Sequence, residues 1–138
     1  INVGISADFD IKNPPEYVFV TYGKILDSVL EAEAFLRAKG LSVGVILTEV
    51  IKPYDFITET LMSLSGKAKR ILYVEEGIEN GGAATLTMNS LRKSGFDFAS
   101  TDYRISAIED SFVSPDAPCD IYEYAGLSPR KLVERMLL

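Results

Sequence analysis

Short continuous runs of apolar residues alternate along this 138-residue chain with stretches in which apolar residues recur every three or four positions. The runs are typical of strands buried on both faces, and the spaced stretches are typical of helices with one buried side. The runs predict strands at 17–21, 41–47 and 71–74. The spaced stretches predict the helices, which cover residues 24–39, 56–64 and 83–95.

Less regular segments complete the pattern. Apolar and polar residues alternate within 1–10, which predicts a half-buried first strand. Residues 96–103 are more polar and predict a strand near a sheet edge, whereas 104–125 show no clear period and predict a surface loop. Ser128 and Pro129 suit the cap and first position of a final helix.

These elements predict one α/β domain over residues 1–138. Strands that alternate with helices of this length form parallel βαβ units, with helices on both faces of the sheet. The chain begins at Ile1 rather than at methionine, and its first residues already show a strand pattern. We therefore expect it to be a piece of a longer, multidomain protein.

Composition and charge argue against several classes of function. The net charge is −6 and no lysine-arginine cluster is present, so we expect no nucleic-acid partner. The sequence has no histidine, which removes the usual general base near neutral pH and the commonest metal ligand. No apolar run approaches the roughly 20 residues that span a bilayer, so we expect no membrane partner. The single cysteine, Cys119, fits a reducing cytoplasm.

The charged groups that stand out most follow the 71–74 run. Glu75 and Glu76 lie beyond the carboxyl end of a strand, where open α/β sheets carry their sites. Adjacent residues on an extended chain point in opposite directions, so these two carboxylates should not share a proton. We expect them to cap a helix or to lie in an interface. We assign no catalytic, cofactor-binding or metal-binding residue.

A glycine turn follows these carboxylates. Residues 80–82 read Asn-Gly-Gly and open the next helix, where their amide groups could face an anion. Three preceding glutamates would repel a phosphate, so we favour close approach of a neighbouring strand or subunit. The dinucleotide-binding glycine pattern is absent, because the 17–21 strand is followed by the single glycine Gly23.

Four segments, taken in order, resemble the C-terminal domain of the transketolase-like, thiamine-diphosphate-dependent enzymes. They are VFVTYGKILDSVLEAEAFLRAKGLSVGVI, EVIKPYD, VEEGIENGG and the AGLSP that precedes the last helix. Within this family the 1-deoxy-D-xylulose-5-phosphate synthases look most similar. Residues 108–113 resemble a stretch of those synthases, although Ser111 replaces an arginine and Ser-Pro-Asp at 114–116 replaces a His-Gly.

The resemblance implies a three-layer α/β/α fold with a five-stranded mixed sheet of order 1-3-2-4-5, its first strand antiparallel. It implies a parent enzyme that joins the two-carbon unit of pyruvate to glyceraldehyde 3-phosphate with loss of CO2. Thiamine diphosphate and Mg²⁺ would be held by the other domains of that parent, and this fragment would bind neither and would be inactive alone. Its partners would be those domains and a second subunit of a homodimer.

Two other interpretations stay open. Transketolase itself or the β chain of a 2-oxo-acid dehydrogenase would carry a similar domain. A free-standing flavodoxin-like module that binds an anion or a protein would share the order of strands and helices. The first strand of such a module should be followed by a hydroxyl-rich phosphate loop, and Thr21-Tyr22-Gly23-Lys24 is poor in hydroxyl groups.

We expect an interface with another domain or subunit in the segment formed by Glu76, Gly77, Ile78, Gly81 and Gly82. The glycines remove side chains and permit close approach of backbone. Ile78 is apolar in an otherwise polar segment, where a buried contact would contribute about 1.5–3 kcal/mol.

Overall fold

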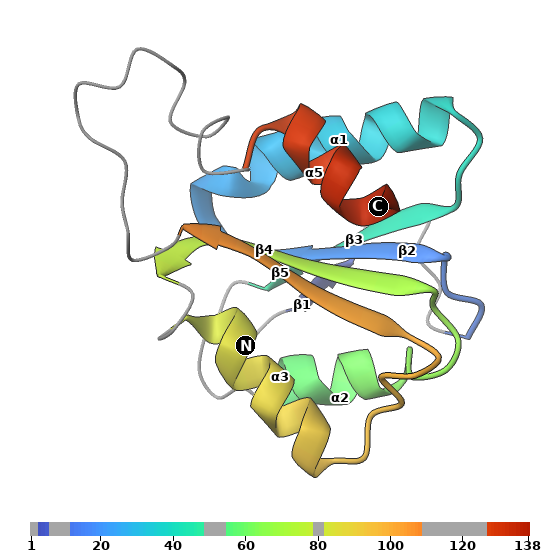
Figure 1. The fold of residues 1–138 in the computed structure, drawn as a ribbon, viewed down its shortest axis with the longest axis vertical. Helices are drawn as coiled ribbons and strands as arrows, with labels where there is room; N and C mark the ends of the chain where they lie inside the picture. The colour runs from blue at the N-terminus through green and yellow to red at the C-terminus, as the bar shows by residue number, and fades with distance from the viewer. Residues whose placement is uncertain (1–2, 6–11, 49–54, 79–81, 109–126) are drawn as a thin grey trace.

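The computed structural model describes residues 3–5, 12–48, 55–78, 82–108 and 127–138 (Figure 1). Strands and helices alternate along these ranges, as the hydrophobic pattern predicts. In chain order they are β1 (Val3–Ile5), β2 (Tyr17–Thr21), the 3-10 turn η1 (Gly23–Ile25), α1 (Leu26–Ala38), β3 (Val43–Thr48), α2 (Asp55–Met62), β4 (Arg70–Ile78), α3 (Ala83–Lys93), β5 (Asp102–Ile108) and α5 (Pro129–Leu137).

The sheet has the order β1-β3-β2-β4-β5. Strands β2, β3, β4 and β5 are parallel, with Tyr17 of β2 opposite both Val43 of β3 and Arg70 of β4. The short strand β1 pairs antiparallel with β3. All five residues of β2 are buried, which agrees with its central place between β3 and β4. The predicted α/β class, with a parallel sheet between helices, is confirmed.

Helices cover both faces of the sheet and bury two separate cores. Helices α1 and α5 lie on one face, and α2 and α3 lie on the other (Figure 1). Alternation along β2 divides its side chains between the cores: Phe19 packs beneath α1 and α5, whereas Val18 and Val20 pack beneath α2 and α3.

The direction of winding reverses at β2. The chain leaves β2 through α1 to β3 on one side, then passes through α2 to β4 on the other side. The connections that leave β2 and β4 therefore diverge, and a crevice between their carboxyl ends follows from this topology. Such a crevice is the usual ligand site of an open α/β sheet, so its contents decide what this domain can bind.

Strand β4 is longer than the sequence pattern suggests. We expected the strand to stop at Val74, but it continues through both glutamates to Ile78. Between Val74 and Ile78 the register with β5 shifts, so that β4 advances four residues while β5 advances two. A bulge of this kind redirects side chains locally. The two glutamates thus belong to a bulged strand end and not to a loop.

The last strand begins later than expected. The predicted strand at 96–103 is wrong for most of its length, because β5 starts at Asp102. Phe96 is instead buried in the core beneath α2 and α3. The turn that follows is held by Asp97, whose carboxylate accepts a hydrogen bond from the amide of Ser100 and whose carbonyl accepts one from the amide of Thr101. The loop predicted from residue 104 is likewise wrong as far as Ile108.

Helix α5 begins at the cap that the sequence predicts. The Ser128 hydroxyl accepts a hydrogen bond from the amide of Lys131, and Pro129 is the first helical residue. Leu132 and Met136 of this helix are fully buried in the core beneath α1. The contacts of α5 therefore complete that core.

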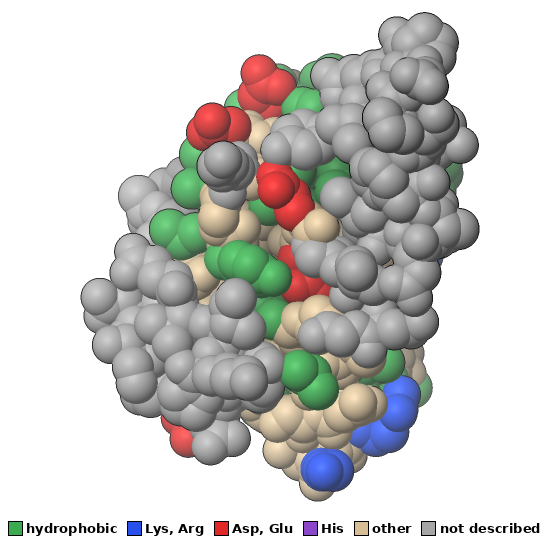
Figure 2. All heavy atoms as spheres, turned by 90° about the vertical axis from the view of Figure 1, so that its left-hand side faces the viewer, with side chains coloured by type: hydrophobic (Ala, Val, Ile, Leu, Met, Phe, Trp, Pro, Cys, Tyr) green, Lys and Arg blue, Asp and Glu red, His purple; other side chains and the backbone are tan. Residues whose placement is uncertain are grey.

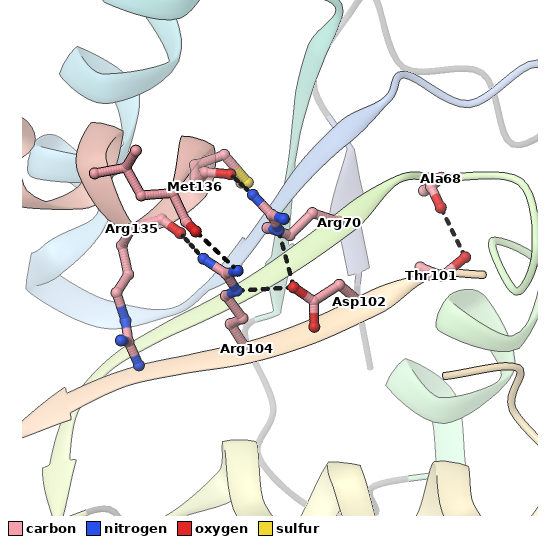
Figure 3. Close-up of polar contacts among 8 residues, drawn as sticks. Ala68, Arg70, Thr101, Asp102, Arg104, Arg135 and Met136 are labelled. Atoms are coloured by element: carbon pink, nitrogen blue, oxygen red, sulfur yellow. Dashed lines mark hydrogen bonds and ion pairs between the residues drawn. The ribbon is translucent and has the colours of Figure 1, made fainter. Parts of the chain in front are cut away.

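The carboxyl end of α5 is held by arginines from the sheet (Figure 3). Arg70 donates to the carbonyl of Met136 at 2.6 Å, and Arg104 donates to the carbonyl of Arg135 at 2.8 Å. Both guanidinium groups also contact one carboxylate oxygen of Asp102, at 3.0 and 2.8 Å. The last carbonyls of a helix have no partner within it and carry partial negative charge, so cations from the strands stabilise this end.

We predict that Arg70→Lys lowers the free energy of unfolding by about 1–3 kcal/mol, since one ammonium group cannot replace a fork that reaches both Asp102 and Met136. Arg130→Lys is the matched control, because Arg130 pairs with Glu134 at an exposed position of α5 and should cost less than about 1 kcal/mol. Urea denaturation followed by circular dichroism measures both. Equal losses in the two variants would contradict a special role for Arg70.

Candidate functional site

The crevice between β2 and β4 contains a buried carboxylate. Tyr22 follows β2 directly, and Glu75 lies in the bulged part of β4. Glu75 continues the alternation of Ile71 and Tyr73, which both face the core beneath α2 and α3. Its side chain therefore points toward the start of α3.

Glu75 is completely buried, and three groups donate hydrogen bonds to its carboxylate. The Tyr22 hydroxyl donates at 2.7 Å, the amide of Ala83 at 3.1 Å and the amide of Ala84 at 3.2 Å. Gly82, the N-cap residue of α3, has no side chain that could accept hydrogen bonds from these amides. Glu75 thus serves as the cap of a helix that starts eight residues later, and it faces the positive end of the helix dipole.

A second tyrosine holds the same helical turn. The Tyr103 hydroxyl donates to the carbonyl of Ala84 at 2.9 Å. Burial raises the pKa of Tyr103 well above 10, and the neighbouring Tyr73 and Glu75 raise it further. Tyr103 consequently keeps its proton and remains a donor. The first turn of α3 is fixed by Glu75 at its amides and by Tyr103 at a carbonyl.

This arrangement limits what the crevice can bind. A helix start at the carboxyl edge of a parallel sheet is a ready-made site for an anionic ligand. Here the side chain of Glu75 already accepts the hydrogen bonds of the Ala83 and Ala84 amides. An external phosphate would have to displace a buried carboxylate that has three hydrogen bonds. The expected capping role of Glu75 is confirmed by these contacts.

The predicted interface residues that the structure describes flank Glu75 and the start of α3 along the chain. Glu76 is half-buried next to Glu75, Gly77 and Ile78 are the last residues of β4, and Gly82 precedes α3. Gly81 lies outside the described residues. Figure 2 looks onto this edge of the sheet and shows acidic and hydrophobic side chains between the parts drawn in grey, with basic side chains only near one end.

Sequence reasoning missed the two hydrogen-bonding tyrosines. The sequence pattern assigns no role to Tyr22 or Tyr103, but their hydroxyls donate hydrogen bonds to Glu75 and to the first turn of α3. The one available signal was the position of Tyr22 directly after a buried strand, on the edge where Glu75 was expected.

Within the described residues, no group of three or more acidic or cysteine side chains is placed to hold a metal ion. None of the helices in these ranges is long and apolar enough to cross a bilayer.

The fold and the filled crevice define a class of doubly wound α/β domain in which the usual ligand position is taken by the chain's own side chain. A family model described as "Transketolase, C-terminal domain" matches residues 10–132. The chain therefore belongs to the transketolase C-terminal domain family.

Curated relatives are 1-deoxy-D-xylulose-5-phosphate synthases. The synthase of Anaeromyxobacter dehalogenans strain 2CP-1 is 30% identical over 105 residues, which is 76% of this chain and 16% of the relative. That of Gloeobacter violaceus is 29% identical over 119 residues, and that of Bacillus velezensis is 24% identical over 147. These alignments cover 86% and 99% of this chain but only 18% and 23% of the relatives. The chain thus spans less than a quarter of their length.

Solved structures agree on the fold. A split-gene transketolase, described as an inactive β4 tetramer, gives a TM-score of 0.69 at 20% identity and covers 91% of this chain and 40% of that one. A 2-oxoglutarate:ferredoxin oxidoreductase from Magnetococcus marinus gives 0.57 at 15% identity and covers 98% of this chain and 19% of that one. At these identities the likeness concerns the fold alone.

We predict that Glu75→Gln lowers the free energy of unfolding by about 1.5–3 kcal/mol. Glutamine keeps the shape, but its NH2 group cannot accept, so at least one buried donor loses its partner. Glu59→Gln, at an exposed position of α2, is the control and should stay within about 0.5 kcal/mol. Urea denaturation with an unchanged m-value is the measurement. A loss at Glu75 no larger than the loss at Glu59 would contradict the capping role.

Proposed function

We propose that this chain is the non-catalytic C-terminal domain of a cytoplasmic, homodimeric 1-deoxy-D-xylulose-5-phosphate synthase. The parent enzyme would convert pyruvate and glyceraldehyde 3-phosphate to 1-deoxy-D-xylulose 5-phosphate and CO2, a step toward isoprenoid and thiamine precursors. The observation that carries this proposal is the family match over residues 10–132, together with synthase relatives of which the chain spans at most 23%.

The Glu75 cap supports a role in assembly. A domain that bound the diphosphate of the cofactor would be expected to offer free backbone amides at the start of α3. In this chain the Glu75 carboxylate accepts a hydrogen bond from each of the first two amides of that helix. We assign thiamine diphosphate and Mg²⁺ to the other domains of the parent. What remains for this domain is to present a rigid surface to those domains and to the second subunit.

We predict that the 138-residue chain alone shows no saturable binding of thiamine diphosphate together with Mg²⁺ in a calorimetric titration. The full-length parent, titrated in the same way, is the positive control. The same parent should release CO2 and form 1-deoxy-D-xylulose 5-phosphate when pyruvate and glyceraldehyde 3-phosphate are supplied together. Micromolar binding by the chain alone would contradict the non-catalytic role. A parent that transfers ketol units or oxidises 2-oxo acids would instead be another member of the family.

We further propose that the edge formed by Glu76, Gly77, Ile78, Gly81 and Gly82 contacts another domain or subunit. Gly82 has φ −81° and ψ 163°, an extended conformation that any residue adopts. Its backbone therefore gives no reason for glycine. Close approach of a neighbouring surface is the reason that we favour, because only a missing side chain permits it.

Gly82→Trp separates this interface from a purely internal role. We expect the variant of the 138-residue chain to keep a near-normal melting temperature, whereas the same change in the full-length parent abolishes dimerisation or activity. Calorimetry of the chain and light scattering with an activity assay of the parent are the measurements. Glu59→Trp, on the exposed side of α2, controls for the added aromatic surface. An unfolded variant chain, or a variant parent that dimerises and turns over normally, would contradict the proposal.

A further inference from the structure

The outer edge of β5 has no neighbouring strand in the part of the chain that the structure describes, because β5 is the last strand in the order of the sheet. β5 is seven residues long, whereas β1 at the opposite edge has three. It contains no proline or glycine that would interrupt it. A long, regular edge strand offers a row of backbone groups to any extended chain, so natural proteins usually protect it. β5 therefore needs a protection that the very short β1 does not.

The backbone groups of β5 can be assigned to its two sides. The amide of Asp102 donates to the carbonyl of Lys69 at 3.0 Å, so the backbone groups of Asp102 face β4. Those of successive residues in a strand point to opposite sides, and the register between β4 and β5 is unbroken from Asp102 to Ser106. The backbone groups of Arg104 therefore also face β4. Those of Tyr103 and Ile105 face the free edge.

Arg135 of α5 occupies this free edge. Its guanidinium donates to the carbonyl of Ile105 at 2.8 Å. Figure 3 shows the side chain of Arg135 reaching from α5 to β5. An incoming strand would need the Ile105 carbonyl as an acceptor for one of its own amides, and it would need the space that the guanidinium fills.

The contact of Arg135 is not required to hold α5 on the sheet. Arg70 donates to the carbonyl of Met136, and Arg104 donates to the carbonyls of Arg135 and Leu138. These contacts run from the strands to the backbone of the helix, so they fix its carboxyl end whatever side chain stands at position 135. Only the Arg135 side chain runs in the other direction, from the helix to a backbone acceptor of the edge strand.

We propose that Arg135 covers the free edge of β5 and prevents a further strand from pairing with it. The excluded partner is an extended backbone, whose amides would donate to the carbonyls of Tyr103 and Ile105. A charged donor suits this role, because a strand that displaced the guanidinium would deprive it of its acceptor. The proposal does not depend on the reaction of the parent or on the interface proposed at the carboxyl edge of the sheet.

Removal of the guanidinium tests the proposal. Arg135→Ala should make the folded 138-residue chain aggregate about tenfold faster than the wild-type chain below its melting temperature, since one hydrogen bond from a charged donor corresponds to about that factor. Light scattering measures the rate. Arg130→Ala removes the same charge from an exposed position of α5, where Arg130 pairs with Glu134, and should leave the rate unchanged. Arg135→Lys keeps a cation beside the edge and should stay close to the wild-type rate.

Hydrogen exchange shows whether the free edge of β5 is the surface that pairs. In the wild-type chain the amides of Tyr103 and Ile105 should exchange quickly and that of Arg104 slowly. Aggregates of Arg135→Ala, exchanged in D2O and then dissolved for NMR, should show protected amides at Tyr103 and Ile105, because an added strand would accept their hydrogen bonds. An Arg135→Ala chain that aggregates no faster than Arg130→Ala would overturn the proposal. Aggregates that leave these two amides unprotected, as those of an unfolded chain would, also overturn it.

Discussion

The burial of one carboxylate governs the arrangement of this domain. A carboxyl group that is completely buried needs hydrogen-bond partners, because the burial of an unpaired polar group is costly. Its partners come from two separate elements, the Tyr22 hydroxyl after β2 and the first amides of α3. The start of α3, the bulge in β4 and the conformation after β2 are therefore mutually dependent. The same contacts place a side chain where related topologies place a ligand.

The sheet separates the buried apolar residues of this domain into two cores. Side chains of β2 and β4 alternate between the layers, so each strand contributes to both cores while the helices contribute to one. The carboxylate network lies on the side of α2 and α3, and the arginine contacts lie on the side of α5. Residues at the carboxyl edge of the sheet, beside α3, can thus differ without a change in the packing of the core beneath α1 and α5.

The pattern of apolar residues along the chain predicted most of the strands and helices, but it predicted few of the contacts at the candidate site. Continuous apolar runs identified β2 and β3, and Gly40 ends the first long helix with φ +85°. The predicted end of β4 was wrong because the burial of Glu75 depends on tertiary contacts. The predicted start of β5 was wrong because the turn before it is tied to distant residues: the Asp97 amide donates to the Ser65 hydroxyl, and the Thr101 hydroxyl donates to the carbonyl of Ala68. Tyr22 and Glu75 are separated by 53 residues, so no local spacing relates them. A charged residue such as Glu75 after an apolar run normally suggests that the buried strand has ended, because charged side chains are rarely buried. Its hydrogen-bond partners become visible only in the folded structure.

The position of α5 has a consequence for folding during synthesis. This helix lies C-terminal to every strand, yet it completes the core beneath α1 with Leu132 and Met136. Its arginine contact joins Arg70 to Met136 across 66 residues of sequence. On the ribosome the lower layer can close once β5 has emerged, whereas apolar surface on the other face stays uncovered until α5 leaves the exit tunnel. During that interval the nascent chain should bind chaperones through one face of the sheet.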